Sequence, residues 1–456
     1  EAAARSRHNG VMKRFRNALL GVLLALTVGL STAFSAQAAS LIRDAEIENM
    51  IRTYATPLMR AAGVDPDAVT IYLVDDPEIN AFVAGGMNLF VHTGLLEQSD
   101  DPAGVIGVLA HEVGHIAGGH LARLPGALES IRIESLIALV LGAAAIAGGA
   151  TDAGQAIIAG GTGLAQQGLF RYTRAQEQAA DQAGLGYLEA TGQSAHGLLS
   201  LLEKIRNEQL LVAARQSPYL RTHPLAQDRV LHIRNHIANS TYSYRPPAPE
   251  YVEMFARARA KLDGFLHPPA QTLAKYPTSD QSLAARYARA VAYFRMADLS
   301  NALIEIDALL AESPRDPYFY ELKGQMFFEN GRVREAIGPY QEAVALRPAE
   351  PLFRLELAQA QIEVNDPELD QAALKNLRIA VVRVRTDPTL WRYLGIAHGR
   401  AGDYGESSLA LAEEAFLRHR PQDVAFHLAR AEQHLAEGTP GWLRLQDLKR
   451  AAEDLE

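Results

Sequence analysis

The stretch that most constrains the fold of this chain is the pentapeptide His111-Glu112-Val113-Gly114-His115. A helix places side chains four residues apart on one face, so a helical segment lets both imidazoles reach one metal ion. Zinc suits such a pair, because it binds neutral imidazole nitrogens and in catalytic sites leaves one position open for water. Glu112 would then accept a proton from that water as it attacks a peptide carbonyl polarised by the metal.

The residues around the pentapeptide predict a buried helix. Asp101 followed by Pro102 is typical of an N-cap with proline in the first turn, and Gly118-Gly119 predicts the helix end. The positions between are largely apolar: Val105, Ile106, Val108, Leu109, Val113 and Ile116. The alternative is a solvent-facing helix whose two histidines are spaced by chance. A buried helix, however, needs partners for its histidines and glutamate, because unpaired buried polar groups are costly, and a metal ion supplies them.

A zinc site needs a third protein ligand from elsewhere in the chain. The metzincin pattern H-E-x-x-H-x-x-G-x-x-H requires a histidine where this chain has Leu121, and His120 is one residue out of step. A better candidate is Glu177, in a segment from Tyr172 to Gly184 that predicts a second helix. Asp181, one turn later, could accept the free N–H of a ligand histidine. Spacing alone also allows an ordinary helix with solvated acids.

Several segments resemble those of the gluzincin metallopeptidases related to HtpX and the CaaX prenyl proteases. The H-E-x-x-H is followed by an R-x-x-E-x-x-A-D segment, and then by a T-H-P segment with a downstream arginine. Upstream lies a counterpart of the family's N-A-F entry to the catalytic helix. The matching residues are Asn80-Ala81-Phe82, His111, Glu112, His115, Arg174, Glu177, Ala180, Asp181, Thr222-His223-Pro224 and Arg229.

This resemblance covers roughly residues 45–235 and implies a zinc metallopeptidase domain. It implies that Glu177 is the third zinc ligand, that Asp181 supports the ligand histidines, and that Arg229 belongs to the catalytic surroundings. His223 is implied to lie at the active site, with two roles left open. It could stabilise the oxyanion, or it could bind zinc as a fourth ligand and keep the enzyme inactive until a substrate or partner moves it.

The segment before the pentapeptide predicts a β-strand from Met87 to Thr93, because it is apolar and lies between Gly85-Gly86 and Gly94. In a protease such a strand can pair with an extended substrate through main-chain hydrogen bonds, and it can equally be a core strand of a small sheet. His92 is predicted to be a strand residue and not a ligand, because the three-ligand set is already filled.

The N-terminal segment has the pattern of a secretory signal. A basic cluster precedes an uncharged run over residues 18–30, and Ala36-Gln37-Ala38 fits the A-x-A rule for cleavage. Cleavage would remove residues 1–38, of which 1–11 are an extension of unclear origin. The alternative is an uncleaved membrane anchor over 18–39.

The chain is acidic, with a net charge of −9 from 44 basic and 53 acidic residues. Removal of residues 1–38 would make it more acidic, because that segment holds five basic residues and one acidic residue. We therefore expect no nucleic-acid partner and no electrostatic binding to anionic lipid. The absence of cysteine excludes disulfides and thiolate metal ligands.

An Ala- and Gly-rich stretch, residues 136–169, separates the two predicted catalytic helices, with Asp152 as its charged residue. Each arm is too short and too rich in glycine for a transmembrane helix, so a tight helical hairpin is predicted. Its role stays open between a cover on the active site, a membrane-facing flap and simple core packing.

The sequence changes character after Ser243. A proline-rich stretch over 245–249 and a helix from Glu250 to Leu266 predict a connector over 244–279. Four turn positions then recur with spacings of 34, 34 and 37 residues, each seven residues after a small residue. The turn positions are Ala297, Gly331, Asn365 and Gly402, and the small residues are Ala290, Gly324, Ala358 and Gly395.

This period and the motif Trp391-x-x-Leu394-Gly395-x-x-His398 resemble the tetratricopeptide repeat, whose small residues lie where paired helices cross closely. The resemblance implies a curved solenoid with a concave groove for segments of other proteins. Three extra residues near 366–370 leave the register of the third repeat open, and a helix from Gln422 to Glu437 is expected to end the array.

The sequence thus predicts a mainly α fold in three parts. These are a zinc metallopeptidase domain with helices and a small β-sheet over 39–243, the connector over 244–279, and a tetratricopeptide-repeat domain over 280–456. The combination resembles bacterial periplasmic zinc endopeptidases that act in outer-membrane β-barrel assembly. That resemblance implies one zinc ion per chain, misfolded or stalled outer-membrane proteins as substrates, and contact of the repeats with the assembly machinery. Peripheral membrane contact, a non-catalytic assembly adaptor with structural zinc, and a membrane-anchored HtpX-like protease stay open as alternatives.

Overall fold

The computed structural model describes residues 40–85, 87–120, 172–211, 219–220, 223 and 227–453. The predicted signal segment and the Ala- and Gly-rich stretch lie outside these residues, as do Leu121, Thr222 and Pro224. Among the described helices, none has both the length and the apolar character needed to cross a bilayer.

The N-terminal unit, defined as the described residues between 40 and 248, is built around a four-stranded sheet. Its strands are β1 (Ser40–Ile42), β2 (Thr70–Asp75), β3 (Ala81–Ala84) and β4 (Asn88–His92). Their order is β1-β2-β4-β3, with β2 parallel to β4 and both outer strands antiparallel to their neighbours.

The strand predicted over Met87–Thr93 is β4, one residue shorter at each end because helix α3 (Thr93–Gln98) already begins at Thr93. β4 lies inside the sheet, with β2 on one side and β3 on the other. The expectation that this strand pairs with a substrate is therefore wrong, since both of its edges are occupied by neighbouring strands. Its other predicted role, as a core strand, is confirmed. Among the described strands, β3 is the edge on this side of the sheet.

Helices cover the sheet and share one apolar core with it. They are α2 (Ala45–Ala61), α3, α4 (Pro102–Ala117), α7 (Arg174–Ala190), α8 (His196–Leu211) and α10 (Gln227–Asn239), whereas the short η1 (Pro66–Ala68) has no buried residue. The helix predicted around the pentapeptide is α4. Asp101 caps it by accepting a hydrogen bond from the Ala103 N–H at 2.8 Å, and Gly119 follows its end at φ +60°. Every residue from Pro102 to His115 is buried, which excludes the solvent-facing alternative.

The repeat array, defined as α13 to α22, forms five helix pairs within described residues 283–453. Its helices are α13 (Leu283–Arg295), α14 (Leu299–Glu312), α15 (Pro317–Glu329), α16 (Val333–Leu346), α17 (Pro351–Glu363), α18 (Pro367–Arg383), α19 (Pro388–Arg400), α20 (Tyr404–Leu417), α21 (Pro421–Glu432) and α22 (Pro440–Glu453). The predicted turn positions Ala297, Gly331, Asn365 and Gly402 all have positive φ, between 57° and 83°. At the small-residue position Gly324, a Cβ atom would lie 2.6 Å from the Tyr340 ring, so paired helices cross closely there.

The structure answers two questions about the array: where the three extra residues of the third repeat go, and how the array ends. The three extra residues of the third repeat lengthen α18 to 17 residues, against 14 in α14 and α16, so the fold absorbs them without a break. The expectation that one helix over Gln422–Glu437 ends the array is wrong. α21 ends at Glu432, and α22 follows because Gly438, at φ +78°, turns the chain before Pro440.

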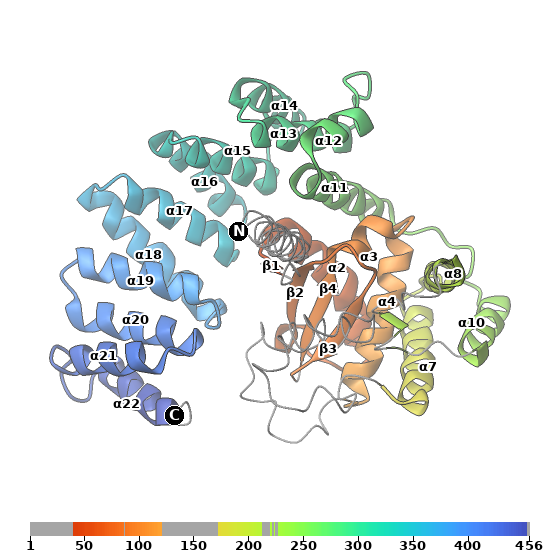
Figure 1. Cartoon of the computed structure of the whole chain (residues 1–456), viewed down its shortest axis with the longest axis horizontal. Coiled ribbons are helices and arrows are strands. Elements are labelled where there is room, and N and C mark those ends of the chain that lie inside the picture. Colours follow the sequence, from red (N-terminus) through yellow and green to blue (C-terminus); the bar gives the residue numbers. More distant parts are fainter. Residues whose placement is uncertain are drawn as a thin grey trace, which may run out of the picture.

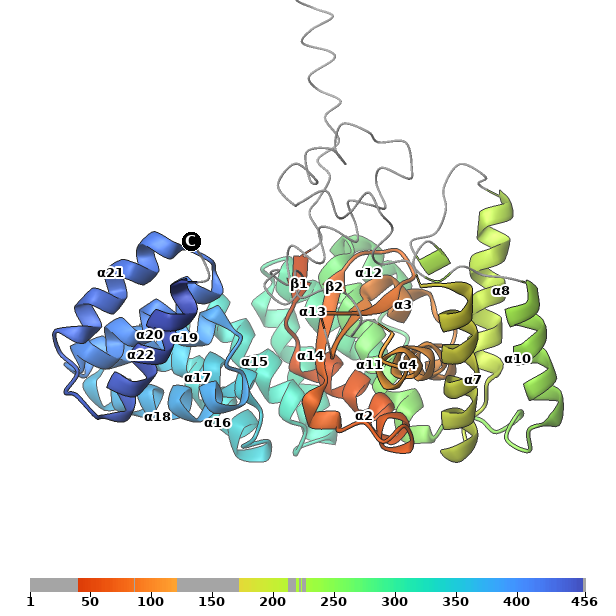
Figure 2. The same cartoon turned by 90° about the horizontal axis from the view of Figure 1, so that it is seen from below.

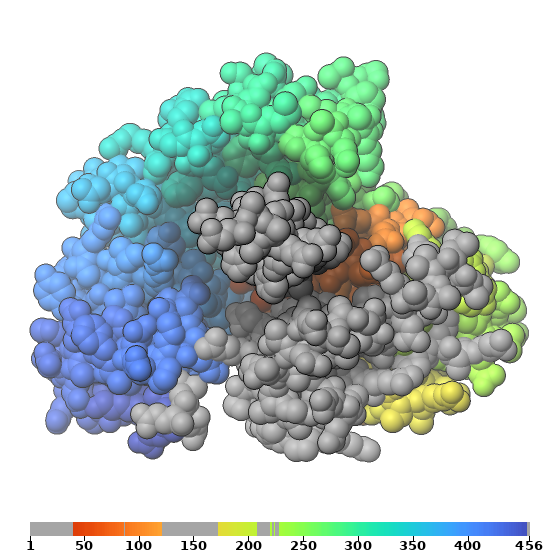
Figure 3. All heavy atoms as spheres, in the orientation of Figure 1, coloured from red at the N-terminus to blue at the C-terminus, as the bar shows by residue number. Residues whose placement is uncertain are grey.

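The connector is part of both cores. Its helix α11 (Pro249–Leu266) contributes Phe255, Ala258 and Leu262 to the core of the N-terminal unit. At the other end of α11, a Cβ atom on Gly264 would lie 2.6 Å from the Val291 side chain of α13. Helix α12 (Pro269–Lys275) then leads into the array. The array curves from α13 to α22 in an arc with the N-terminal unit on its inner side (Figures 1 and 2), and its side chains form one continuous curved wall (Figure 3).

The inner face of the first helix pairs is occupied by the chain's own helix α2. Ala45 at the start of α2 shares an apolar cluster with Ala343, Leu352 and Phe353 of the array. The Tyr287 hydroxyl donates a hydrogen bond to Glu46 Oε2 at 2.7 Å. The groove expected for segments of other proteins is therefore partly filled from within the chain.

Candidate metal centre

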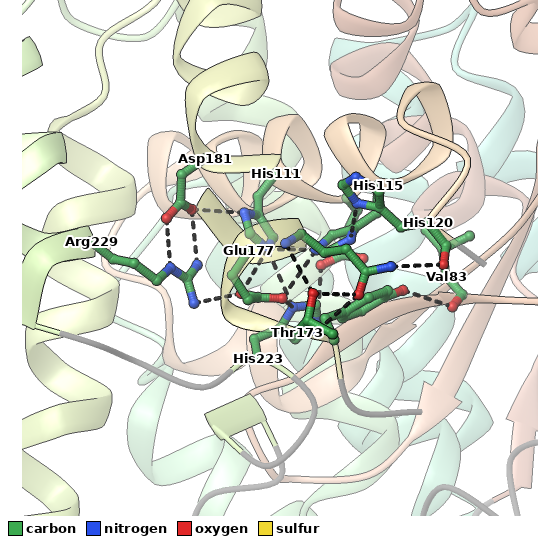
Figure 4. Close-up of polar contacts among 12 residues, drawn as sticks. Val83, His111, His115, His120, Thr173, Glu177, Asp181, His223 and Arg229 are labelled. Carbon is green, nitrogen blue, oxygen red and sulfur yellow. Dashed lines mark hydrogen bonds and ion pairs between the residues drawn. The ribbon is translucent and has the colours of Figure 1, made fainter. Parts of the chain in front are cut away.

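Helices α4 and α7 cross at backbone contact, and this crossing brings the predicted ligands together. A Cβ atom on Gly114 would lie 2.7 Å from the Ala180 carbonyl oxygen, and one on Gly184 would lie 3.0 Å from the Ala110 backbone. The start of α7 is held by a capping box between Thr173 and Gln176. The tight crossing places the face of α4 with His111 and His115 against the face of α7 with Glu177 and Asp181, as Figure 4 shows.

Four donor groups converge at this crossing. His111 Nε2 lies 3.1 Å from His115 Nε2 and 3.2 Å from His223 Nδ1. Glu177 Oε1 lies 3.3 Å from His115 Nε2 and 3.1 Å from His223 Nδ1, and Glu177 Oε2 lies 3.5 Å from His111 Nε2. All four side chains are buried, and one ligand atom from each lies within 4.8 Å of the others.

These distances suit a metal ion. Zinc bonds of about 2.0–2.2 Å in tetrahedral geometry place the ligand atoms roughly 3.3 Å apart. Burial lowers the pKa of His115 to about 2, so its imidazole is neutral and offers a lone pair. Burial opposes ionisation of Glu177, but the neighbouring His223, His111 and His115 outweigh it and lower its pKa, so it offers a carboxylate. Burial opposes protonation of His111, but Asp181 and Glu177 outweigh it and raise its pKa to about 10. Donor atoms this close together need a positive charge between them, which is a proton on His111 in the absence of metal and the metal ion when it is bound.

A second layer of contacts orients the ligands. His111 Nδ1 lies 2.9 Å from Asp181 Oδ1, which leaves Nε2 free to face the other donors. Arg229 reaches in from α10 and bridges both carboxylates: its Nε donates to Asp181 Oδ2 at 2.5 Å, and its Nη1 lies 2.5 Å from Glu177 Oε2. Burial opposes ionisation of Asp181, but hydrogen bonds from Arg229 and His111 lower its pKa to about 2. Arg229 thus contacts the predicted ligand Glu177 directly, a contact that the sequence did not indicate.

Glu112 lies beside the donor set and is fully buried. Neither of its carboxylate oxygens has a hydrogen-bond partner among the described residues, although Oε1 lies 3.4 Å from His223 Nε2. Burial raises the pKa of Glu112 above its ordinary value. A buried carboxylate that accepts no hydrogen bond from any described residue, next to four converging donor groups, can take a proton from a water molecule.

Two side chains that the sequence did not place at the site, those of His120 and Tyr172, contact His115 in the structure. His120, considered only as a metzincin ligand, lies with its Nδ1 2.9 Å from His115 Nδ1. Tyr172, considered only as a helix start, stacks on the His115 ring at a centroid distance of 3.6 Å. A histidine close after the H-E-x-x-H is visible in sequence, but the position of Tyr172 depends on the crossing of α4 and α7. His92 ends β4, is buried and lies outside the converging group, as predicted.

Comparison with known proteins gives a consistent result. The profile of peptidase family M48 matches residues 42–237. The chain is 29% identical over 385 residues to the beta-barrel assembly-enhancing protease of Yersinia pestis, over 83% of this chain and 78% of that protein. It is 27% identical over 414 residues to the protein of the same name from Escherichia coli (strain K12), over 88% of this chain and 82% of that one. A third relative, metalloprotease LoiP of Escherichia coli (strain K12), is 27% identical over 202 residues, 43% of this chain and 72% of that protein. The similarity to the first two extends beyond the region that the family profile covers.

Proposed function

Residues 42–237 form a metallopeptidase domain of family M48, and from this premise we propose that the chain is a zinc endopeptidase of the periplasm. We further propose that it acts in the assembly and quality control of outer-membrane β-barrel proteins. The observation that carries the enzymatic part is the convergence of His111, His115 and Glu177 next to the buried carboxylate of Glu112, which has no hydrogen-bond partner in the described part of the chain.

In the proposed mechanism, His111, His115 and Glu177 hold the zinc ion. When bound, zinc would polarise the scissile carbonyl and lower the pKa of the attacking water. Glu112 accepts a proton from that water at a carboxylate oxygen and passes it to the leaving amine, and its raised pKa suits a group that must do both near neutral pH. Asp181 holds His111 in the tautomer with Nδ1 protonated.

The substrate would be aligned by β3, the free edge of the described sheet. β3 pairs with β4 on one side only, and its residue Ala81 lies next to His223 at the donor set. An extended peptide can add to such an edge by main-chain hydrogen bonds. We therefore propose that the substrate aligns on Ala81–Ala84 and not on the strand expected from the sequence.

The wider role rests on the relatives and on the domain organisation. The Yersinia and Escherichia relatives are named as beta-barrel assembly-enhancing proteases, and their similarity covers most of both chains. We propose misfolded or stalled outer-membrane proteins as substrates, the repeat array as the contact with the assembly machinery, and export by the signal over residues 1–38. We also propose the domain boundaries: the metallopeptidase domain over 39–243, the connector over 244–279 and the tetratricopeptide-repeat domain over 280–456. A purely structural zinc site is disfavoured, because it would have no use for the buried carboxylate of Glu112.

Zinc dependence tests the enzymatic proposal. We expect about one zinc ion per purified chain, loss of peptide cleavage after treatment with a chelator, and recovery on adding zinc. Glu177→Ala is expected to lose both bound zinc and activity, because one of three ligands is gone. Elemental analysis and cleavage of an internally quenched peptide measure the two properties.

The matched control for that variant is Glu189→Gln on the same helix. Glu189 contacts Ser240, away from the donor set, so this change should leave zinc content and cleavage unaffected. Retention of stoichiometric zinc by Glu177→Ala would contradict the proposed ligand set.

His223→Ala distinguishes the two roles left open for His223. In the structure His223 Nδ1 lies within the donor set, which supports a fourth ligand that keeps the enzyme inactive at rest. We therefore expect the variant to cleave a quenched peptide or casein faster than wild type, with zinc content retained. A stabiliser of the oxyanion would behave in the opposite way, with a loss of about 10²–10³ in kcat. Unchanged or lower activity would contradict the inhibitory role.

A further inference from the structure

The register of β3 shows which of its backbone groups face the free edge. The His92 N–H donates to the Asn80 carbonyl at 3.1 Å, and Ala81 and Val83 stand opposite Val91 and Leu89. Hydrogen-bonded pairs alternate with non-bonded pairs in an antiparallel ladder. Because Asn80 bonds to β4, Ala81 and Val83 direct their own N–H and C=O groups away from β4. These are the groups that an added strand would need.

Both outward carbonyls already have partners from within the chain. His223 Nε2 lies 3.3 Å from the Ala81 oxygen, and the Tyr172 hydroxyl donates to the Val83 oxygen at 3.2 Å. The second contact is the dashed line that ends on Val83 in Figure 4. The two side chains come from different parts of the sequence, yet they take alternate carbonyls of one edge, as the N–H groups of a paired strand would do.

Tyr172 is held in this position from two sides. Its side chain is buried, with 4% of the residue exposed, and its ring stacks on His115 at 3.6 Å with an interplanar angle of 26°. The contact between ring and ligand imidazole connects the strand edge to the metal centre.

We propose that Tyr172 is a positioning residue that closes the substrate edge of β3, and that a substrate must displace its hydroxyl from the Val83 carbonyl before it can pair there. This inference rests on the proposed endopeptidase function. It also names the substrate class: unfolded, extended segments long enough to pair at both Ala81 and Val83. We call the hydrogen bond from the Tyr172 hydroxyl to the Val83 carbonyl the internal cap. A short peptide that pairs at only one of the two residues gains too few main-chain hydrogen bonds to compete with this cap.

The test compares peptide binding by two inactive proteins, Glu112→Gln and Glu112→Gln/Tyr172→Phe, each loaded with zinc. Phenylalanine keeps the ring on His115 and removes the donor to Val83. We expect the dissociation constant for a fluorescent extended peptide to fall about three- to tenfold, the value of one hydrogen bond. In the active enzyme, Tyr172→Phe alone should lower KM by a similar factor and leave kcat unchanged, with the larger gain for the shorter peptide.

Tyr187→Phe, which removes a tyrosine hydroxyl in the last turn of α7, is the matched control and should change neither constant. Unchanged or weaker peptide binding by the double variant would overturn the inference, as would a fall in kcat, which would make Tyr172 a direct participant in the reaction. If the wild type cleaves with zinc and Tyr172→Phe binds no more tightly, the inference fails and the proposed function stands. If the double variant binds more tightly but no zinc-loaded form cleaves, the proposed function fails and the cap stands.

Discussion

Glu112→Gln is expected to abolish peptide cleavage while the bound zinc stays at the wild-type level. Glutamine has nearly the shape of glutamate but cannot accept the proton of the attacking water, and loss of a general base costs about 10²–10⁴ in rate. Glu112 is outside the group of four converging donor residues, so we expect metal binding not to depend on it. The rate constant for a quenched peptide and the zinc content by elemental analysis check both parts.

The same variant separates the enzyme from the assembly adaptor. If the protein is an adaptor with a structural zinc site, the Glu112→Gln variant would support assembly of outer-membrane proteins as well as wild type does. If the protein is a protease, the variant would leave stalled outer-membrane proteins undegraded. Glu189→Gln again serves as the carboxylate control on α7. Full cleavage by the Glu112 variant would remove this residue from the mechanism.

Lys261→Met is expected to destabilise the whole described fold by about 3–5 kcal/mol, because it removes the cation that pairs with Asp44 and Glu321, whereas Glu46 keeps its pair with Arg257. Lys261 lies on α11 with 2% of its surface exposed. Its Nζ is 2.7 Å from Asp44 Oδ2, 3.4 Å from Glu321 Oε2 and 3.7 Å from Glu46 Oε2. These partners come from the start of α2 and from α15, so one ammonium group joins the N-terminal unit to the repeat array. Urea unfolding at constant pH measures the loss.

Lys323→Met is the matched control. It removes a lysine of the repeat array whose ion-pair partner, Asp307, is exposed to solvent. Lys323 pairs with Asp307 at 2.7 Å, but the Asp307 side chain is 54% exposed, and such pairs contribute about 1 kcal/mol or less. Equal unfolding free energies for the two variants would show that the buried network does not hold the two parts together.

Much of the site was accessible from local pattern. The histidines of α4, four residues apart in an apolar segment between Asp101 and Gly118, predicted a buried helix that presents both rings on one face, and α4 has these features. The turn positions of the repeats were equally visible, because Gly331 and Gly402 adopt a backbone conformation that few other residues tolerate. In both cases the deciding interactions lie within a few residues along the chain.

Other features could not be predicted in the same way. The apolar run at Met87–Thr93 predicted a strand correctly, but not that β2 and β3 would flank it and leave β3 as the edge. The groove of the array was expected to be open, whereas α2 packs into it through Ala45 and Glu46. Helix α22 was missed, although Thr439-Pro440 is an N-cap signal, because the repeat period had already ended.

The division between these two groups has one physical reason. Helix and turn positions, and the residue types able to bind a metal, follow from short-range sterics and side-chain chemistry, and each can be read from spacing. Strand order, the filling of the inner face of the array, and the placement of Tyr172 and Arg229 against β3 and Glu177 follow from packing between segments far apart in sequence. Such packing depends on the sum of many weak contacts over the whole chain, and no single spacing in the sequence records that sum.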